Sequence, residues 1–389
     1  MTQPMKIMQI LPALHAGGVE RGTIEIAKAL TQQGIPNIVV SSGGPMAYEL
    51  KRIGVRHITL PVQSKNPFKI WMNARKLRQV IKEESITIVH ARSRAPAWVA
   101  KIALKKCPGV RFLTTFHGVY NLGPWRIKKP YNRVMASGDL VISISNFVTR
   151  HILDQYHIAS SRIRLIYRGA DIEKFDPLKV SQERIAELAG RWQVPLDKPV
   201  MMLPGRLTRW KGHLVLLEAL AQMKNKNVTC IFVGSDQGRT DYHHELKERI
   251  EKLDPETSVI IEDHCSDMPV AYMLADIVVS ASTDPEAFGR VIPEAQAMGR
   301  LVVGTDHGGA TETIQNGKTG FLVPPGDATA LASTLDMMLE MNLGERKKMS
   351  MEAMKSVHDY FSIQKMCEKT IAVYEELSTE APGCQQTPK

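Results

Sequence analysis

Residues 283–295 read TDPEAFGRVIPEA, and they follow a largely apolar run over 275–280 that is typical of a buried parallel strand. Proline is tolerated only in the first turn of a helix, so Pro293 places the start of a helix near Arg290 or Val291. A strand, a loop and a helix in this order form the repeating unit of a parallel α/β sheet. The fold assignment starts from this stretch.

The loop before this helix is a candidate binding site for an anion, because the first turn of a helix leaves N–H groups without intrahelical partners. Gly289 has no Cβ that would keep a ligand away from the backbone. Glu286 precedes the helix and Glu294 lies in its early turns, so one carboxylate could contact a sugar and the other could accept from paired ribose hydroxyls. Both could equally be solvated acids that favour the helix dipole.

Short apolar strands alternate with helical stretches along the whole chain, which is the rhythm of a parallel sheet with helices on both faces. Two such series lie on either side of a proline-containing connector at 175–199, and they predict an α/β fold with two doubly wound domains. The predicted strands are 6–11, 37–41, 55–60, 86–90, 111–115, 140–143 and 163–166 in the first series, and 200–203, 228–233, 259–261, 277–280, 301–303 and 320–323 in the second.

The domain limits follow from these series. We expect an N-terminal domain over 1–190 and a C-terminal domain over 191–360. The C-terminal region is expected to form helices broken near 342–344 and near Tyr360, with a further helix over 361–380. The proline- and glycine-containing tail over 381–389 is expected to be disordered.

The composition is that of an ordinary globular protein, with 389 residues, 43% hydrophobic and 23% charged. No apolar run reaches the roughly 18 residues of a membrane span, and the first residues lack the apolar core of a signal peptide, so we expect a cytoplasmic protein. The five cysteines show no C-x-x-C spacing, which argues against a disulfide framework or a zinc site.

The charge is divided unevenly between the two halves. Residues 1–190 hold 29 lysines and arginines against 12 aspartates and glutamates, a formal charge of +17, whereas residues 191–389 hold 21 against 28, or −7. The basic half should favour an anionic partner, such as a phosphorylated lipid or an anionic membrane surface. No helix-turn-helix, zinc-finger or RNP pattern supports binding to nucleic acid.

Glycines and a histidine follow strands of the first half. Gly17 and Gly18 precede a helix and would let backbone amides approach phosphate or sugar oxygens, although a plain tight turn is the alternative. The pair does not match G-x-G-x-x-G, so a nicotinamide cofactor is weakly supported. His117 sits between a strand and Gly118, where it could donate to a sugar hydroxyl, but isolated histidines are more often ordinary loop residues.

The second half places cations at a strand-to-helix junction. Arg206 follows a strand and Lys211 begins a helix, and together they could neutralise a diphosphate, the alternative being two surface cations. His264 and Cys265 leave another strand where a nucleotide base could be contacted; one such pair is weak evidence for a metal, and backbone contacts are favoured. Gly308 and Gly309 form another glycine turn before a helix.

Several catalytic motifs are missing from the sequence. There is no G-x-S-x-G, P-loop, H-E-x-x-H or D-x-D cluster. Their absence argues against a hydrolase, a kinase, a metalloprotease and a metal-dependent transferase.

The chain resembles the retaining glycosyltransferases of family four over nearly its whole length. The resemblance rests on the Glu-x7-Glu segment with its Phe-Gly, on the paired glycines, and on Gly205-Arg206 with Lys211-Gly212, in the family's order. It implies two Rossmann-like domains facing a cleft, the GT-B arrangement, with a C-terminal helix that crosses back to the first domain. It also implies a nucleotide-sugar donor, with a UDP-sugar favoured, and neither a metal nor a separate cofactor.

The resemblance also assigns residues. Arg206 and Lys211 would hold the diphosphate, Glu286 the transferred sugar and Glu294 the ribose, while His117 would face the donor sugar. Gly17 and Gly18 would lie at the phosphates and acceptor. The amides that would reach the sugar and phosphate belong to Phe288, Gly289, Arg290 and Val291. Arg168 stands where relatives often have asparagine, which could reflect an anionic acceptor or only a change near the hinge.

The expected reaction is hexosyl or heptosyl transfer with retention to an anionic glycolipid or polysaccharide precursor, as in lipopolysaccharide-core synthesis. A nucleotide-sugar 2-epimerase of the same architecture is the alternative, and the basic first half argues for an acceptor instead. Residues 65–84 interleave Phe68, Trp71, Leu77 and Ile81 with cations, and residues 120–133 interleave aromatic and apolar residues with cations, so we expect peripheral docking on the inner face of the cytoplasmic membrane. The alternative is that the apolar residues face the core and the charges only solvate a surface.

Overall fold

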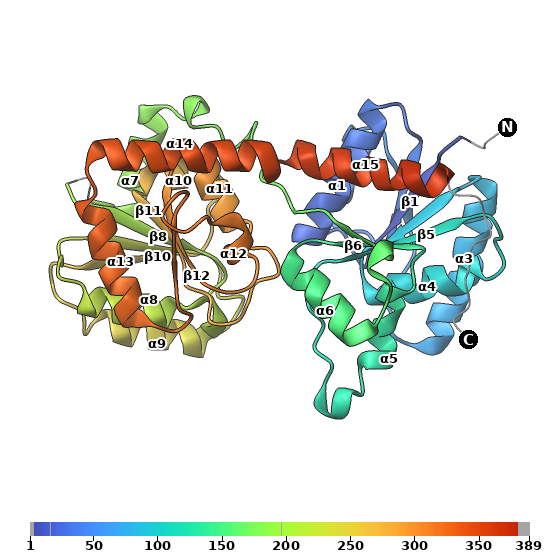
Figure 1. Ribbon diagram of the computed structural model, residues 1–389, viewed down its shortest axis with the longest axis horizontal. Coiled ribbons are helices and arrows are strands. Elements are labelled where there is room, and N and C mark those ends of the chain that lie inside the picture. The colour runs from blue at the N-terminus through green and yellow to red at the C-terminus, as the bar shows by residue number, and fades with distance from the viewer. Residues whose placement is uncertain (1–3, 16, 196, 380–389) are drawn as a thin grey trace. The chain divides into compact units, whose positions relative to one another are not determined.

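The structure, a computed structural model, describes residues 4–15, 17–195 and 197–379, and the chain divides into two compact units (Figure 1). Unit 1 takes the described residues up to Arg168 and those from Gln364 onward, and unit 2 takes Gly169–Ile363. The tail predicted over 381–389 lies outside the described residues.

Unit 1 is built on a parallel sheet of seven strands in the order β3-β2-β1-β4-β5-β6-β7. Its strands are β1 (Ile7–Ile10), β2 (Asn37–Ser41), β3 (Arg56–Thr59), β4 (Ile88–Ala91), β5 (Arg111–Phe116), β6 (Leu140–Ser143) and β7 (Ile163–Leu165). Its α-helices are α1 (Gly18–Gln32), α2 (Ala47–Arg52), α3 (Pro67–Glu83), α4 (Arg94–Leu104), α5 (Lys129–Asn132), α6 (Asn146–Tyr156) and α15 (Ile363–Thr379). Short 3₁₀ helices are η1 (Pro124–Arg126), η2 (Arg133–Ala136) and η3 (Ser160–Arg162).

Unit 2 repeats the design with six parallel strands in the order β10-β9-β8-β11-β12-β13. Its strands are β8 (Val200–Pro204), β9 (Thr229–Val233), β10 (Ser258–Glu262), β11 (Ile277–Ser280), β12 (Leu301–Thr305) and β13 (Phe321–Val323). Its helices are η4 (Pro177–Lys179), α7 (Gln182–Trp192), η5 (Arg209–Lys211), α8 (His213–Gln222), α9 (Thr240–Ile250), α10 (Met268–Leu274), α11 (Val291–Ala297), α12 (Ala310–Thr313), α13 (Ala328–Glu340) and α14 (Leu343–Tyr360).

The predicted α/β fold is confirmed. Each strand expected from the sequence is present within one or two residues of its predicted limits. The inner strands are apolar runs buried on both faces of a sheet, whereas β3, β7 and β10 lie at sheet edges and are at most partly buried. The helix that Pro293 was expected to start begins at Val291. The breaks expected in the C-terminal helices separate α13, α14 and α15.

The division between the units falls after Arg168, earlier than the limit of 190 expected from the sequence. The segment between these two positions packs into unit 2: the ring of Phe175 meets the ring of Tyr272 edge-on at 5.8 Å, and Arg184 of α7 forms an ion pair with Asp267. The proline-rich connector therefore belongs to unit 2 rather than marking its edge.

The C-terminal helix α15 packs on unit 1, where it lies beside α1 (Figure 1). Tyr374 is fully buried and its hydroxyl lies 2.6 Å from Nδ1 of His90 on β4. Arg164 of β7 forms an ion pair with Glu376. These polar contacts join residues far apart in the sequence, so α15 completes the core of unit 1.

Arg168, whose role the sequence left open, is buried in unit 1 with 5% of its surface exposed. Its guanidinium donates to the carbonyl oxygen of Gly18 in the first turn of α1 and lies directly against Gly22. A Cβ at position 22 would overlap both terminal nitrogens of Arg168. Arg168 therefore links the end of β7's following segment to α1, and its position leaves no room for a side chain at position 22.

Replacing Gly22 with alanine should lower the free energy of unfolding by roughly 1–3 kcal/mol, because overpacking at a buried contact outweighs the gain of about 1 kcal/mol in helix propensity. Thermal unfolding measures this change. Gly18→Ala in the same helix is the matched control, since a Cβ there meets nothing within 4 Å. Equal stability of Gly22→Ala and Gly18→Ala would show that Arg168 moves aside at no cost.

Candidate functional site

The predicted site residues lie after strands that end at the carboxyl edges of the two sheets. In unit 2 the sheet grows outward from β8 on one side and from β11 on the other, so these neighbouring strands flank the reversal of strand order. Open α/β sheets bind ligands at this position, because the loops there diverge to opposite faces. Arg206 and Lys211 follow β8, and Glu286 follows β11. The topology therefore brings together residues that are distant in the sequence.

Lys211 and Glu286 form an ion pair between these two loops. The Lys211 Nζ lies 2.7 Å from Oε1 of Glu286, and the Ser282 hydroxyl donates to the same oxygen at 2.7 Å. The two charged side chains are only 12% and 18% exposed, which strengthens their attraction. The Lys211 ammonium also lies 4.6 Å from the ring centroid of Trp210. Both charges are thus held in place by neighbours.

Arg206 differs from Lys211 in that its side chain is exposed and forms no ion pair with any residue that the structure describes. The side chain of Lys211 packs against Gly205, the residue before Arg206: its Cδ lies 3.4 Å from where a Cβ of Gly205 would be. An exposed arginine next to a partly buried lysine can receive an anion without first losing an ion-pair partner.

The loop from Glu286 to Phe288 packs against Gly308 and Gly309, which lie in the turn after β12. The N–H of Gly309 donates to the carbonyl oxygen of Glu286 at 2.8 Å. A Cβ at Gly308 would overlap that carbonyl, and one at Gly309 would overlap Cα of Phe288. Gly308 and Gly309 therefore support the loop by packing against its backbone, and Gly289 turns the chain into α11 with a positive φ of 76°.

Glu294 lies in the first turn of α11, where the Tyr272 hydroxyl of α10 donates to its Oε2 at 3.1 Å. His264 and Cys265 follow β10, with His264 exposed and Cys265 partly buried. Burial raises the pKa of the Cys265 thiol, so it is a neutral thiol near pH 7. Among the described residues, no group of three or more His, Cys, Asp and Glu side chains is placed to hold a metal ion.

Unit 1 carries its own predicted residues at the carboxyl edge of its sheet. Gly17 and Gly18 begin α1 after β1, and His117 directly follows β5. Sequence reasoning missed Arg92 and Arg94, which follow β4, the strand next to β1 at this sheet's reversal of strand order. Arg92 is almost fully buried, and its Nε donates to Gln9 at 2.9 Å.

Sequence reasoning also missed three residues of unit 2. Ser282 holds Glu286, Tyr272 holds Glu294, and His307 donates through Nε2 to the backbone oxygen of Ser282 at 2.8 Å. Ser282 and His307 each lie two residues after the end of a strand, so their position was a usable signal. Tyr272 lies in an apolar helix and has the pattern of a core residue.

Two family models match the chain. The model described as glycosyltransferase family 4 matches residues 16–174, and the model described as glycosyl transferases group 1 matches residues 185–356. The first match lies mostly in unit 1, and the second lies within unit 2.

Three known proteins show how far the similarity extends. A crystal structure of a glycosyltransferase from Rickettsia africae ESF-5 is 41% identical, with a TM-score of 0.89, over 97% of this chain and 100% of that one. Anabaena Alr3699/HepE, crystallised with UDP-glucose, is 25% identical, with a TM-score of 0.79, over 96% and 100%. The D-inositol 3-phosphate glycosyltransferase of Corynebacterium jeikeium (strain K411) is 29% identical over 257 residues, 63% of this chain and 59% of the relative.

Because the Glu286 carboxylate forms an ion pair with the Lys211 ammonium, we expect Glu286→Gln to bind inorganic pyrophosphate about tenfold more tightly than the unmodified chain. The substitution removes the charge that competes for the ammonium, and hydrogen bonds to charged groups are worth about 1.5–3 kcal/mol. Isothermal titration measures the affinity. Glu312→Gln, the same charge change in the first turn of α12, is the control and should leave the affinity unaltered. Weaker binding by Glu286→Gln would mean that the carboxylate supports the anion instead of competing with it.

Proposed function

This chain belongs to the GT-B glycosyltransferases, with a family 4 region followed by a group 1 region, and on that premise we propose that it transfers a sugar from a nucleotide-sugar donor, a UDP-sugar in the first instance, to an anionic glycolipid or polysaccharide precursor. The observation that carries the proposal is the Lys211–Glu286 pair beside Arg206 at the reversal of strand order in unit 2. These side chains supply cations for a diphosphate and a carboxylate for a sugar at one sheet edge.

The donor would bind to unit 2. Arg206 and Lys211 would take the diphosphate, and the backbone of residues 288–291 would approach the sugar and its phosphate. Glu294 would accept from the ribose hydroxyls, and His264 and Cys265 would contact the base through their backbone. The relative crystallised with UDP-glucose supports this choice of donor class.

The reaction would proceed with retention at the anomeric carbon. The bond between that carbon and the diphosphate oxygen breaks, and the acceptor oxygen bonds on the same face while its proton passes to the departing phosphate. Negative charge grows on the diphosphate, so its stabilisation by Arg206 and Lys211 would be the largest catalytic contribution. Glu286 would orient the sugar and support positive charge near the anomeric carbon.

The acceptor would bind to unit 1, whose charge favours an anion. Residues 1–168, the part of the sequence that ends with Arg168 of unit 1, hold 26 lysines and arginines against 7 aspartates and glutamates, and this formal charge of +19 supports a phosphorylated acceptor. A relative named for a phosphorylated acceptor, D-inositol 3-phosphate, supports the same class. Hexosyl and heptosyl donors both suit this scheme, and an acceptor of the lipopolysaccharide-core type is the lipid to test first.

Turnover tests the proposal directly. We expect the purified chain to release UDP from a UDP-sugar only when an anionic glycolipid extract is present, and NMR of the product should show the donor's anomeric configuration. Activity should persist in EDTA, because Arg206 and Lys211 meet the diphosphate charge. Arg206→Ala should lower kcat/KM on the order of 10²–10³-fold.

The assay has clear contrary outcomes. Conversion of the nucleotide sugar to an epimer without acceptor would replace transfer with 2-epimerisation. Loss of activity in EDTA that Mg²⁺ or Mn²⁺ restores would show a metal requirement. Arg249→Ala, an exposed arginine of α9 in the same unit, is the matched control and should retain full turnover.

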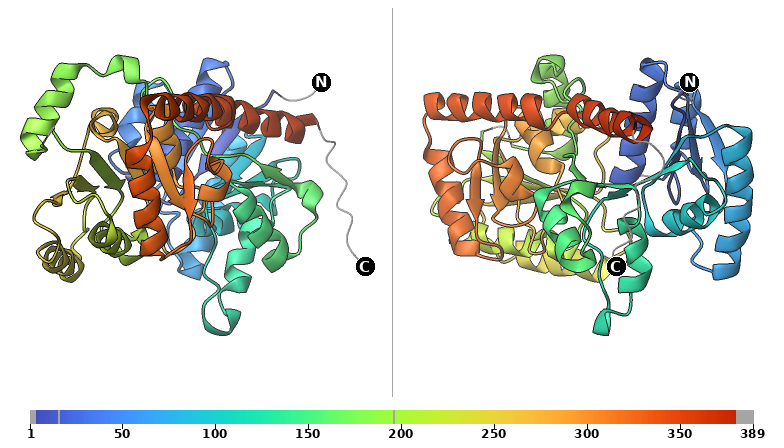
Figure 2. Two further views of the ribbon diagram at one scale, coloured as in Figure 1. Left: turned by 60° about the vertical axis from the view of Figure 1, so that its left-hand side comes forward. Right: turned by 45° about the vertical axis from the view of Figure 1, so that its right-hand side comes forward.

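An anionic membrane surface is the partner that we propose for unit 1. The loop after β5 carries Trp125 and Ile127, which are 96% and 66% exposed, and it projects from the body of unit 1 in every view (Figures 1 and 2). Cationic Arg126 and Lys128 lie beside them. Trp125 and Arg126 both have positive φ, an uncommon backbone for such residues that is often found at functional sites.

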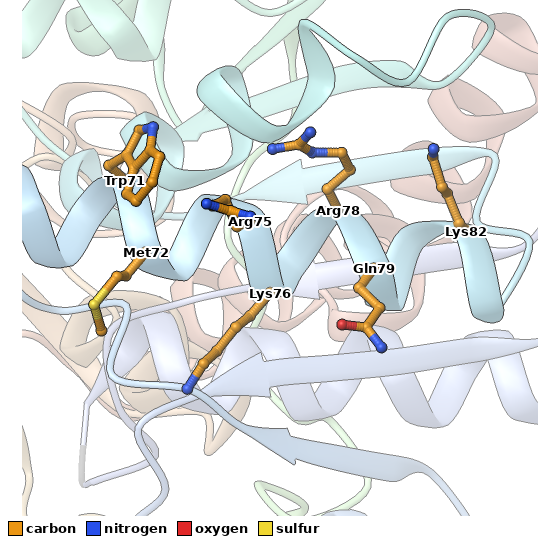
Figure 3. A pocket seen from close by; sticks show the side chains of 7 residues that line it. All are labelled: Trp71, Met72, Arg75, Lys76, Arg78, Gln79 and Lys82. Carbon is orange, nitrogen blue, oxygen red and sulfur yellow. The ribbon is translucent and has the colours of Figure 1, made fainter.

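Helix α3 carries a second surface of the same kind. Its exposed side chains include Phe68 and Trp71, with the Arg75 guanidinium 5.0 Å from the Trp71 ring centroid. Figure 3 shows the row of cations that continues along the helix from Trp71 to Lys82. Leu77 and Ile81, which the sequence had placed with this surface, are instead buried in the core. None of the helices that the structure describes is both long and apolar enough to cross a membrane.

Vesicle co-sedimentation tests this partner. Binding should require phosphatidylglycerol in phosphatidylcholine vesicles and fade as salt rises, since each cation near an anionic surface contributes about 1 kcal/mol. Lys128→Glu/Lys129→Glu should reduce binding at least tenfold. The control, Lys247→Glu/Lys252→Glu, makes the same charge change on unit 2 and should bind normally. Equal binding to neutral vesicles would falsify the proposal.

A further inference from the structure

Tyr272 is fully buried, and its hydroxyl bonds Glu294, a residue of the proposed site. It lies in α10, its ring packs edge-on against Phe175, and its hydroxyl donates to Oε2 of Glu294 at 3.1 Å. Burial, followed by the nearby Glu294 charge, raises the pKa of Tyr272 well above its ordinary value. The hydroxyl therefore stays protonated at all physiological pH values and can act as a donor to the carboxylate.

This hydrogen bond limits how Glu294 can rotate. A glutamate side chain has a freely turning terminal carboxylate, and the planar group loses that freedom when one oxygen is bonded to a rigid partner. The Tyr272 ring cannot move far, because it is packed in the core of unit 2. The carboxylate still has lone pairs for further donors, since its two oxygens together accept about four hydrogen bonds.

Tyr272 also lies near the segment proposed to contact the base. Its electrostatic neighbours include the thiol of Cys265 as well as the Glu294 carboxylate. The Tyr272 hydroxyl therefore bonds the residue proposed for the ribose and lies within electrostatic range of the residue proposed for the base. A buried tyrosine hydroxyl requires a hydrogen-bond partner, and here that partner is the partly exposed carboxylate in the first turn of α11.

We propose that Tyr272 is a positioning residue for ribose recognition: its hydroxyl holds the Glu294 carboxylate in the orientation that accepts both vicinal hydroxyls of the donor nucleotide's ribose. This inference rests on the proposed function. It adds to that function a reason for the enzyme to distinguish ribonucleotides from nucleotides that lack these hydroxyls.

The test compares UDP with 2′,3′-dideoxy-UDP by isothermal titration, first on the unmodified chain and then on Tyr272→Phe. The unmodified chain should prefer UDP. Tyr272→Phe should weaken UDP binding about tenfold, as expected for loss of a hydrogen bond to a charged group, and should leave the affinity for the dideoxy nucleotide unchanged. In turnover, the donor KM should rise while kcat stays close to its original value.

Two variants keep this result specific. Tyr242→Phe removes another buried tyrosine hydroxyl from unit 2, in α9, and should bind both nucleotides as the unmodified chain does. Glu294→Gln should lose the preference for UDP more completely than Tyr272→Phe, because the tyrosine acts through the carboxylate. Thermal unfolding of each variant identifies any loss of folded protein.

The outcomes separate this inference from the function on which it rests. If Tyr272→Phe weakens both nucleotides equally, the residue has only a structural role and the inference is wrong, while the proposed function stands. The same holds if Tyr272→Phe keeps the full preference for UDP. If the unmodified chain binds neither UDP, GDP nor ADP, the proposed function is overturned and this inference with it.

Discussion

Parallel pairing of β8 with β11 places Met201 opposite Ile277 and Met202 opposite Val278, and this register determines where the loops of unit 2 meet. Strands that run in the same direction end at the same edge, so the loops after β8 and β11 become neighbours although about 75 residues separate Lys211 from Glu286. Without this pairing, neither residue would have its partner. The ion pair is thus a consequence of sheet topology.

The candidate site is rigid because its charged groups are held by buried or nearly buried neighbours. Ser282 and Lys211 share one oxygen of Glu286, Tyr272 bonds Glu294, and the glycines at 308 and 309 bear on the backbone of the intervening loop. Each contact removes rotational freedom before a ligand arrives. A site arranged in this way loses less entropy on binding, which is the physical basis of preorganisation.

Unit 1 differs from unit 2 in that it buries two arginines near the carboxyl edge of its sheet. Arg168 and Arg92 carry charge into the interior and bond to Gly18 and Gln9, while most of the other cations stay at the surface. The exposed cations then combine with Trp71, Trp125 and their neighbours to form the basic, aromatic surfaces that distinguish this unit from unit 2.

Local sequence signals determined the order of strands and helices, because apolar runs of four to six residues and a proline such as Pro293 act over short distances. They also marked Arg206, Lys211, Glu286 and Glu294 as candidate site residues, because each stands near a junction between a strand and a helix. Only the tertiary structure showed that Leu77 and Ile81 are buried in the core. It alone also showed that Arg168 packs against Gly22 and that the Tyr272 hydroxyl donates to Glu294. The physical reason is that burial and hydrogen-bond partners depend on which elements pack together, and residues far apart in the sequence supply them.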